Sequence, residues 1–510
     1  MYCNLQVTLD SNPSNDRSES AIAANPLNAN NMVGASKRFT NPSTYEFSLA
    51  AYATFDAGRT WIEAPPLIVP TGWAGTSDPA LAWDNVGNAY LVGLPFGPQM
   101  DGPVLGIAIY KSTDGGNTWG APQLIHASRA DDKQWAAGDR SAGSPHYGNV
   151  YVVWDNGAQL AFARTIDHGA TWKGVGDQPV GSRLADDSFA PVVSVGSDGT
   201  VYIAWVGNTN VKLVKSSDGG EVFSAPQIVA SGITPLRPNT SGLPELPGGS
   251  FRVFTLPDIC TGTGGNLVVA WADFREGVSR IYCRNSGDGG TSWQGAVAGR
   301  PLLPGYLGSA ADQHDFHPQL ASTPSGQIAC AFYEFGPQGG TSPLIHVIVA
   351  LSDDGGASFV RRETVTNRPW DPAIDAPLAH GDTKITFIGD YFGLTGSSLG
   401  FFPLWTDTRT GIQEMFSARL MSLGPWDGIQ FYGTVAGGQT SRWVTFDWPA
   451  CWHVLWLVVP TNPLSGAPQI RWRVQVERSS ENNICYWISV SNLTSVPVAV
   501  EGRFSVLAAD

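Results

Sequence analysis

The sequence predicts an all-β protein: a seven-bladed β-propeller over residues 1–425, followed by a small β-sandwich over residues 426–510. Three observations predict this fold. Only 15% of the 510 residues are charged, whereas glycine (59) and proline (36) are abundant, as expected for short strands joined by tight turns. One eight-residue motif recurs six times, and the hydrophobic pattern alternates with a period of two after the last repeat.

The repeated motif has the form Ser/Thr-x-Asp-x-Gly-x-x-Trp/Phe, as in STDGGNTW at residues 112–119. Its other copies are TFDAGRTW, TIDHGATW, SSDGGEVF, SGDGGTSW and SDDGGASF. The third-position aspartates, at intervals of 51 to 70 residues, are Asp56, Asp114, Asp167, Asp218, Asp288 and Asp354. Intervals of this order are typical of propeller blades, whose repeats reach about 50 residues.

Each repeat also contains a pattern of short strands. A turn and a β-branched or aromatic run precede most copies, as in GNAYLVGL and GTVYIAWVG, and another apolar stretch precedes that run. Each unit is therefore predicted to hold four antiparallel strands, as a propeller blade does. The units begin near Ser20, Asp78, Lys133, Phe189, Arg252, His317 and Thr386, and the seventh lacks the motif. We expect the N-terminal segment to supply a strand to that last blade.

The six motifs match the Asp box, or bacterial neuraminidase repeat, so residues 20 to about 420 resemble the sialidase superfamily of propellers. The resemblance implies a propeller fold and an activity directed at glycans. Two departures count against sialidase activity itself. The first blade has no Arg-Ile-Pro motif, and the sequence holds seven units where sialidases of this family typically have six blades. A six-bladed arrangement is the alternative.

The motif aspartates are predicted to be structural. An aspartate in a tight turn accepts hydrogen bonds from backbone N–H groups, the glycine adopts a positive φ, and the aromatic residue buries apolar area. In a blade, the turn between the third and fourth strands lies on the face opposite the loops that lead into the innermost strands. A binding site is therefore expected on that other face, at the propeller axis.

Charged residues gather in the loops expected at the axis. The loops before the innermost strands carry Asp78, Asp131, Asp132, Lys133, Arg252, His314 and Asp315. The loops after the second strands carry Asp155, Asp273, Arg275, Tyr333, Glu334, Asp407 and Arg409. The segments WADFREG and WTDTRTG have two interpretations of equal weight, a ligand-binding pair or a structural pair within the blade.

The resemblance implies a sialidase-like mechanism, which requires an arginine cluster, an acid–base carboxylate and a tyrosine nucleophile assisted by a glutamate. The candidates for the arginine cluster are Arg252, Arg275 and Arg409. Tyr333 or Tyr391 is the candidate nucleophile, with Glu334 as its partner. The candidates for the acid–base residue are Asp78, Asp131 and Asp132. Further candidates for substrate binding are Asp273, Asp407, His314, Asp315 and Lys133.

Charge and composition exclude other classes of function. A net charge of −14 without any Lys/Arg run disfavours nucleic acid as a partner, and no apolar stretch is long enough to span a membrane. The six cysteines lack CxxC spacing, so no metal site and no cofactor are expected, although the acidic loops could bind Ca²⁺. We expect a secreted protein, although no signal peptide is visible in this chain.

Residues 426–510 alternate between apolar and polar side chains, as in IRWRVQVERS, which predicts an antiparallel β-sandwich. The tryptophans of this region either fill its core or stack on sugar rings, as in a carbohydrate-binding module. Most of them follow the alternating pattern of core residues. Trp448 and Trp452 do not follow it and are the better candidates for binding a sugar. A role in assembly is a further alternative.

These observations favour a glycan-recognising extracellular protein that acts as a sialidase-like exo-glycoside hydrolase at the propeller axis. The alternative is a non-catalytic glycan-binding protein, such as a lectin or adhesin, or a structural propeller. The loops after the second strands differ from unit to unit, which favours a single site over one repeated pocket per blade.

Overall fold

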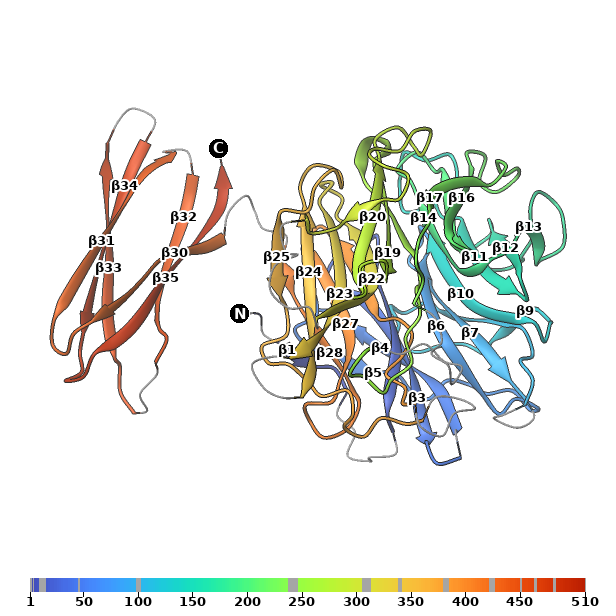
Figure 1. The fold of residues 1–510 in the computed structure, drawn as a ribbon, viewed down its shortest axis with the longest axis horizontal. Helices are drawn as coiled ribbons and strands as arrows, with labels where there is room; N and C mark the ends of the chain where they lie inside the picture. Colours follow the sequence, from blue (N-terminus) through green and yellow to red (C-terminus); the bar gives the residue numbers. More distant parts are fainter. Residues whose placement is uncertain are drawn as a thin grey trace. The chain divides into compact units, whose positions relative to one another are not determined.

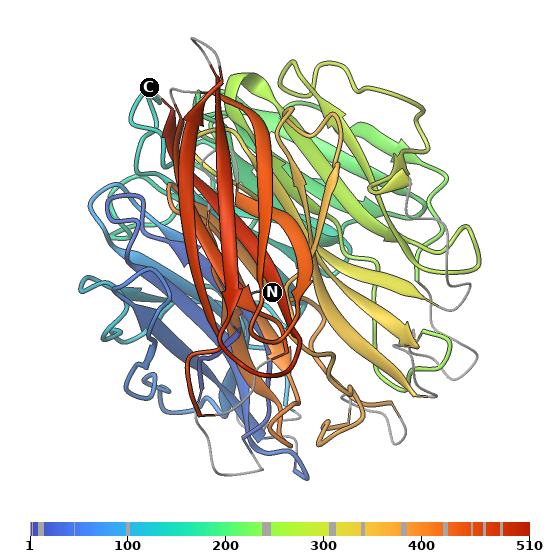
Figure 2. The same cartoon turned by 90° about the vertical axis from the view of Figure 1, so that its left-hand side faces the viewer.

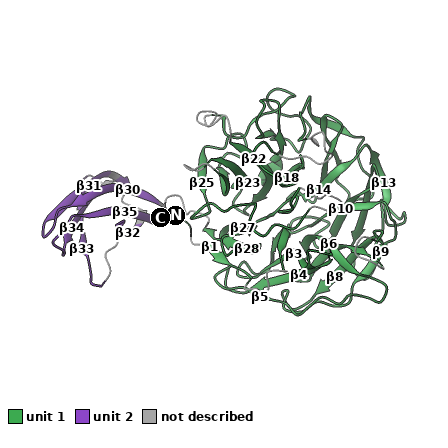
Figure 3. Ribbon diagram, turned by 60° about the horizontal axis from the view of Figure 1, so that its bottom comes forward, with its two compact units in different colours: residues 1–421 green, residues 422–510 purple. Residues whose placement is uncertain are grey.

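A computed structural model describes residues 2, 4–8, 15–44, 46–97, 102–236, 246–304, 313–337, 342–378, 385–421, 427–449, 452–462, 466–479 and 483–509. The chain divides into two compact units, Met1–Met421 and Ser422–Asp510 (Figure 3). Both consist of β-strands, and a 3₁₀ turn at Thr263–Gly265 is the one helical element in the described ranges.

The described part of unit 1 contains seven antiparallel sheets (Figure 1). The first three are β2–β5 (Arg17–Ala24, Met32–Asn41, Glu46–Thr54, Ile62–Glu63), β6–β9 (Gly75–Trp83, Ala89–Phe96, Ile107–Ser112, Gln123–His126) and β10–β13 (Asp131–Gly138, Val150–Asn156, Gln159–Thr165, Ser182–Asp186). The next three are β14–β17 (Phe189–Val195, Val201–Gly207, Asn210–Ser216, Gln227–Ser231), β18–β21 (Asp258–Thr261, Leu267–Asp273, Arg280–Ser286, Arg300–Pro301) and β22–β25 (His314–Ser322, Ile328–Pro337, Pro343–Ser352, Arg361–Thr364). The seventh combines β26 (Gly393–Ser397), β27 (Gly400–Asp407), β28 (Glu414–Ala418) and β29 (Leu420–Met421) with the N-terminal β1 (Asn4–Gln6).

Apolar runs and tight turns explain the strand pairing. Strand β11, with the sequence VYVVWDN, is buried from Val150 to Asp155 because it pairs with β10 and β12 and is covered on both faces. The two residues Gly157 and Ala158 join β11 to β12. Gly157 has a φ of +64°, which glycine adopts without a steric penalty.

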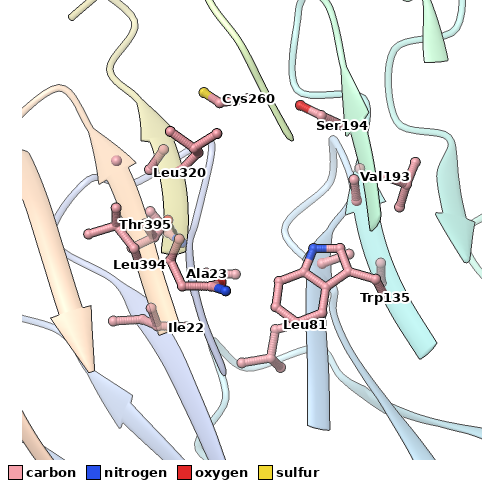
Figure 4. A pocket seen from close by; sticks show the side chains of 18 of the residues that line it. Ile22, Ala23, Leu81, Trp135, Val193, Ser194, Cys260, Leu320, Leu394 and Thr395 are labelled. Carbon is pink, nitrogen blue, oxygen red and sulfur yellow. Dashed lines mark hydrogen bonds between the residues drawn. The ribbon is translucent and has the colours of Figure 1, made fainter. Parts of the chain in front are cut away.

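The seven sheets of unit 1 form a closed ring. The innermost strands β2, β6, β10, β14, β18, β22 and β26 each contact the next, and β26 contacts β2. At the outer edge of the last sheet, Asn4 pairs with Ala418 and Gln6 with Phe416, so the N-terminal strand completes the sheet that ends unit 1. Residues of all seven innermost strands line one axial cavity of about 140 Å³, into which Trp135 and Leu81 project (Figure 4).

The six repeated motifs form six similar turns after the third strands of the first six sheets. In one of them, Asp114 accepts hydrogen bonds from Thr118 N (2.9 Å), Thr118 Oγ1 (2.6 Å) and Ser112 Oγ (2.8 Å). Corresponding bonds from backbone N–H groups reach Asp56, Asp167, Asp218, Asp288 and Asp354. The aromatic residues that end the motifs pack against the core and are Trp61, Trp119, Trp172, Phe223, Trp293 and Phe359.

The motif turns lie beside the first turn of a neighbouring sheet, away from the start of the innermost strands. Asn31, between β2 and β3, donates a hydrogen bond of 3.0 Å from Nδ2 to the carbonyl of Gly115 in the Asp114 turn. Partial burial alone would raise the pKa of the turn carboxyls, but hydrogen bonds outweigh it in five turns and lower the pKa of each. At Asp288, the bonds from Ser292 lower the pKa to about 2.

Unit 2 consists of two three-stranded antiparallel sheets, whose long strands run side by side (Figure 2). One sheet has the order β30-β35-β32 (Asp427–Val435, Val498–Ala509, Trp452–Pro460) and the other β31-β34-β33 (Thr440–Pro449, Asn483–Asn492, Ile470–Arg478). Both sheets contribute to one hydrophobic core. Trp448 is buried in that core, with its ring centroid 5.5 Å from that of Trp456, which contradicts the expectation that it is free to bind a ligand. The side chain of Trp452 lies outside the described residues.

Substitution of a motif aspartate is expected to destabilise unit 1. Asp114→Ala removes the acceptor of three hydrogen bonds, so we expect the free energy of unfolding to fall by about 1 kcal/mol at pH 7. Because the folded-state pKa is lowered, this contribution is present above about pH 4 and disappears as the pH falls through the folded-state value. Urea unfolding at pH 7 and pH 3 measures both effects. Asp177→Ala, which removes an exposed surface pair with Lys173, is the control and should leave the stability unchanged.

Candidate functional site

Five innermost strands of unit 1 carry the same β-bulge near their N-terminal ends. In each bulge one residue other than glycine adopts a left-handed conformation, with φ between 44° and 56°. These residues are Glu19, Asp78, Lys133, Ala190 and His317. Such a conformation costs about 1–2 kcal/mol per residue, and strain that recurs at one structural position marks a candidate functional site.

The bulge side chains lie close enough together to influence one another's protonation. The negative charge of Asp78 acts on the pKa of both Glu19 and Lys133, and the positive charge of Lys133 acts on that of His317. The five bulges therefore bring residues from distant parts of the sequence to one end of the ring axis.

Two more charged residues reach this end of the axis from the segments that precede β18 and β26. Phe251 and Thr386 form a parallel β-bridge, in which Arg252 N donates to Thr386 O (2.9 Å). The Arg252 side chain then donates from Nε to Asp390 Oδ1 (3.0 Å) and from Nη2 to Asp390 Oδ2. We define the bulge cluster as Glu19, Asp78, Asp132, Lys133, Arg252 and Asp390.

Lys133 lies between two aromatic rings. Its Nζ is 4.5 Å from the ring centroid of Trp135 and 4.1 Å from that of Tyr391. These distances are typical of cation–π contacts. Removal from bulk water lowers the pKa of Lys133, although the carboxylates of Asp78 and Glu19 oppose the change.

The carboxyls of the bulge cluster differ in environment. Glu19 is buried, and burial followed by the charge of Asp78 raises its pKa well above the usual range. The pKa of Asp132 is raised to about 6, first because protein replaces bulk water around it and second because Asp78 adds a like charge. Asp132 nevertheless keeps an exposed surface, so a ligand can reach it. A reachable carboxyl with this pKa can donate or accept a proton near neutral pH.

His317 lies buried next to the cluster. Both of its ring nitrogens lack a hydrogen-bond partner among the described residues, and Phe316 and Tyr333 pack beside its ring. Burial, together with the positive charges of Arg252 and Lys133, lowers its pKa to about 3, so the imidazole is neutral at physiological pH.

A pocket of about 540 Å³ lies beside the fourth sheet, and it is linked to the bulge cluster through Phe189, Phe254 and Arg252. Phe189, which is 42% exposed, lines it, and its ring centroid is 5.8 Å from that of Phe254. The guanidinium carbon of Arg252 lies 5.3 Å from the Phe254 ring. Exposed aromatic surface is thus continuous with the charged groups.

The structure brings Asp78, Asp132, Lys133, Arg252 and Tyr391 together, but it places Asp131 elsewhere. Asp131 is buried and accepts hydrogen bonds from Trp154 Nε1 (2.8 Å) and His126 Nδ1 (2.6 Å). Adjacent strand residues point to opposite faces of a sheet, so Asp131 and Asp132 cannot share one site.

Tyr333 and Glu334 are separated for the same reason. The Tyr333 ring stacks on Phe392 at 4.5 Å and its hydroxyl accepts a hydrogen bond from Thr406 N, whereas Glu334 forms an ion pair with Arg362. They do not form the expected nucleophile pair. Tyr391 is buried, its hydroxyl donates to Pro79 O (3.4 Å), and burial raises its pKa well above the usual range, which disfavours a nucleophilic phenolate.

The three candidate arginines do not form a cluster, since each is paired within its own surroundings. In WADFREG, Asp273 accepts from Trp271 Nε1 (3.0 Å) and pairs with Arg275. In WTDTRTG, Asp407 accepts from Trp405 Nε1 (3.1 Å) and from Arg409 Nε (2.9 Å). The geometry of these two segments fits the structural interpretation, and Arg252 alone lies in the bulge cluster.

His314 and Asp315 also lie apart from the cluster. His314 Nδ1 accepts a hydrogen bond from Ser279 N (3.1 Å), and its ring stacks on Phe274. Burial and the adjacent charge of Glu334 raise the pKa of Asp315 to about 8. In the described ranges, no group of three or more His, Cys, Asp and Glu side chains is arranged to hold a metal ion.

Sequence reasoning missed Glu19 and Asp390. An alignment of the strands on their bulges would have found Glu19, because it occupies the position of Asp78 and Lys133. Asp390 has no such signal, since it reaches the cluster through its pairing with Arg252.

No protein-family model matches the sequence, and no curated protein is significantly similar to it. Among solved structures, the chain resembles the Hadza microbial sialidase Hz136 at 12% identity and a TM-score of 0.41, over 64% of this chain and 66% of that one. It resembles Trypanosoma rangeli sialidase at 10% identity and a TM-score of 0.41, over 96% and 91% of the two chains. An ulvan lyase of polysaccharide lyase family PL25 has 11% identity and a TM-score of 0.42, over 79% and 94%. Likenesses this distant carry no conclusion about activity.

No helix among the described residues is long and apolar enough to cross a membrane.

Substitution of Asp155 is expected to change how stability depends on pH. Asp155 Oδ2 accepts a hydrogen bond from N of the bulge residue Ala190 (2.7 Å), and burial raises the Asp155 pKa to about 7. A raised folded-state pKa contributes stability below about pH 4, and this contribution is lost as the pH rises through about 7. Asp155→Asn, which keeps an acceptor for Ala190, should therefore show a smaller fall in unfolding free energy between pH 4.5 and pH 7.5.

Urea unfolding of Asp155→Asn and wild type at these two pH values measures the effect. Asp177→Asn, at an exposed position, should retain the wild-type pH dependence. Identical pH dependence in wild type and Asp155→Asn would contradict the assignment.

Proposed function

We propose that unit 1 is a seven-bladed β-propeller, that unit 2 is a β-sandwich, and that the protein is a secreted glycoside hydrolase acting at the bulge cluster. The observation that carries the activity is the exposed Asp132, whose raised pKa suits a proton donor, among other carboxylates and two cations. The cyclic contacts of the innermost strands support the propeller.

The residues of the cluster divide the chemistry between them. Asp132 would protonate the leaving oxygen of a glycosidic bond, and Asp78 would supply the second carboxyl group that hydrolysis also requires. Arg252 and Lys133 would bind an acidic group of the substrate. Phe189 offers exposed ring surface in the pocket beside the fourth sheet, on which a sugar ring could pack.

This mechanism departs from the sialidase-like one in its nucleophile and its arginines. Tyr391 forms a wall beside Lys133, and Arg275 and Arg409 are held by Asp273 and Asp407. The proposed substrate is therefore an acidic glycan held by one arginine and one lysine. Non-catalytic glycan binding is the alternative, and it is favoured by one observation: Tyr333 and Glu334 are engaged separately, with Glu334 paired to Arg362.

Substitution of Asp132 is expected to abolish turnover. Asp132→Asn should lower kcat/KM by about 100-fold or more on the substrate found by a screen of fluorogenic sialosides and other acidic glycosides. For wild type, the loss of the proton on Asp132 should make kcat/KM fall above about pH 6. Asp177→Asn should behave as wild type. Binding on a glycan array without turnover of any glycoside would select the binding protein.

Substitution of the arginines is expected to separate binding from stability. Arg252→Met should raise KM about tenfold because an anion contact is lost. Arg409→Met leaves the buried Asp407 without its ion pair, so it should lower the unfolding free energy by about 3 kcal/mol and leave KM unchanged. Steady-state kinetics and urea unfolding of both variants test the division. A raised KM in Arg409→Met would contradict this division and would support the earlier hypothesis that the arginines bind the substrate together.

A further inference from the structure

The axial cavity continues, on the side of the motif turns, into a second pocket of about 510 Å³. Ala24, Val195, Thr261, Ser322 and Gly396 line both spaces, as does Arg140. The walls come from the turns between the first and second strands of six sheets, so the pocket is part of the ring itself. A volume of this size suits a small organic ligand.

Arg140 is the one charged side chain among the described residues that line this pocket. The described part of the chain provides it with no ion pair and no hydrogen-bond acceptor. The carboxylate next to it in sequence is occupied, since Asp139 accepts hydrogen bonds from Ser144 Oγ and Ser141 N. Protein around Arg140 lowers its pKa, although the residue keeps an exposed surface that a ligand can reach.

Two buried arginines of unit 1, by contrast, donate most of their hydrogen bonds to protein acceptors. Arg164 donates to Glu221 Oε1 (2.6 Å) and to the carbonyl of Gly176 (2.9 Å). Arg284 donates to the carbonyls of Val229, Trp293, Gln294 and Gly295. Arg140 is exposed within the pocket and has no acceptor among the described residues, so an anionic ligand there would supply the acceptors that its guanidinium lacks.

Polar side chains line the same pocket as Arg140. The hydroxyl-bearing residues of the lining include Ser141, Ser197, Thr263, Thr323, Ser397 and Ser398, in addition to Thr261 and Ser322. Ala24, Pro26, Leu27 and Pro324 supply an aliphatic part of the wall. The lining thus combines one cation, several hydroxyls and an apolar side, and its described residues include no carboxylate that would repel an anion.

We propose that this pocket is a second ligand site, which binds a small hydroxylated molecule with one oxyanion group through Arg140. The oxyanion is a carboxylate, sulfate or phosphate, as an acidic monosaccharide or a free inorganic anion would supply. The site is separate from the bulge cluster, so it does not depend on the proposed hydrolysis.

The test is isothermal titration calorimetry of the full chain at low ionic strength with glucuronate, inorganic sulfate and inorganic phosphate. Binding of at least one probe is expected, with affinity lowered at least about tenfold in Arg140→Gln because a charge-assisted contact is lost. Preference for glucuronate identifies a sugar acid as the ligand, and equal binding of all three identifies a general oxyanion site. Arg59→Gln, at an exposed arginine in a motif turn, is the matched control and should bind as wild type.

A second variant tests the site independently, in case Arg140→Gln does not fold. Ser398→Trp, at an exposed turn position, should obstruct the pocket and weaken binding although Arg140 is retained. Circular dichroism establishes that both variants are folded. If no probe binds to wild type, or if folded Arg140→Gln binds as wild type does, the proposal is wrong.

Discussion

The closed ring of unit 1 is the constraint on which the rest of the structure depends. Each innermost strand must contact two neighbours, and β26 must meet β2 although hundreds of residues separate them. The pairing of Asn4–Gln6 with β28 adds N-terminal hydrogen bonds to the last sheet, so the two ends of unit 1 are held together by one ladder. Because the strands converge on the axis, residues near their ends are concentrated there whatever their separation in sequence.

The bulges turn this convergence into a site. An extra residue in an innermost strand redirects its side chain, and the ring brings five such residues to one end of the axis. The bridge between Phe251 and Thr386 brings in Arg252 and Asp390. Each of these two residues precedes the innermost strand of its own sheet, β18 or β26. Local backbone strain and long-range closure together place the bulge cluster.

The motif turns could be predicted from the sequence because their hydrogen bonds are local. The hydrogen bonds that fix Asp114 come from residues within four positions of it, so the pattern is visible in a short stretch of sequence. The same locality explains why WADFREG and WTDTRTG were ambiguous. Their arginines pair with aspartates two residues away. The sequence alone does not distinguish such an ion pair from two side chains that bind a ligand.

Other parts of the site could not be predicted because they depend on strand phase and on tertiary pairing. Tyr333 and Glu334 are neighbours in sequence, yet the pleat directs them to opposite faces. Asp131 and Asp132 differ in the same way, and a shift of one residue in the assumed register would exchange their environments. The fifth innermost strand was expected near Arg252 but begins at Asp258, after Pro257, which has no N–H to donate to a strand ladder.

The two ends of the axis differ in electrostatic character, and this difference has a physical cause. At the bulge end, each cation faces carboxylates, so the charges of Arg252 and Lys133 are partly compensated before any ligand arrives. At the other end, the short turns between first and second strands supply hydroxyls and backbone groups around a single guanidinium. An anion approaching a protein with a net charge of −14 is repelled at long range, but salt screens that repulsion within about 10 Å, whereas a direct contact with Arg140 inside the pocket is screened less. Affinity for anions is therefore governed by where an uncompensated cation lies along the axis, and the net charge of the chain has little influence on it.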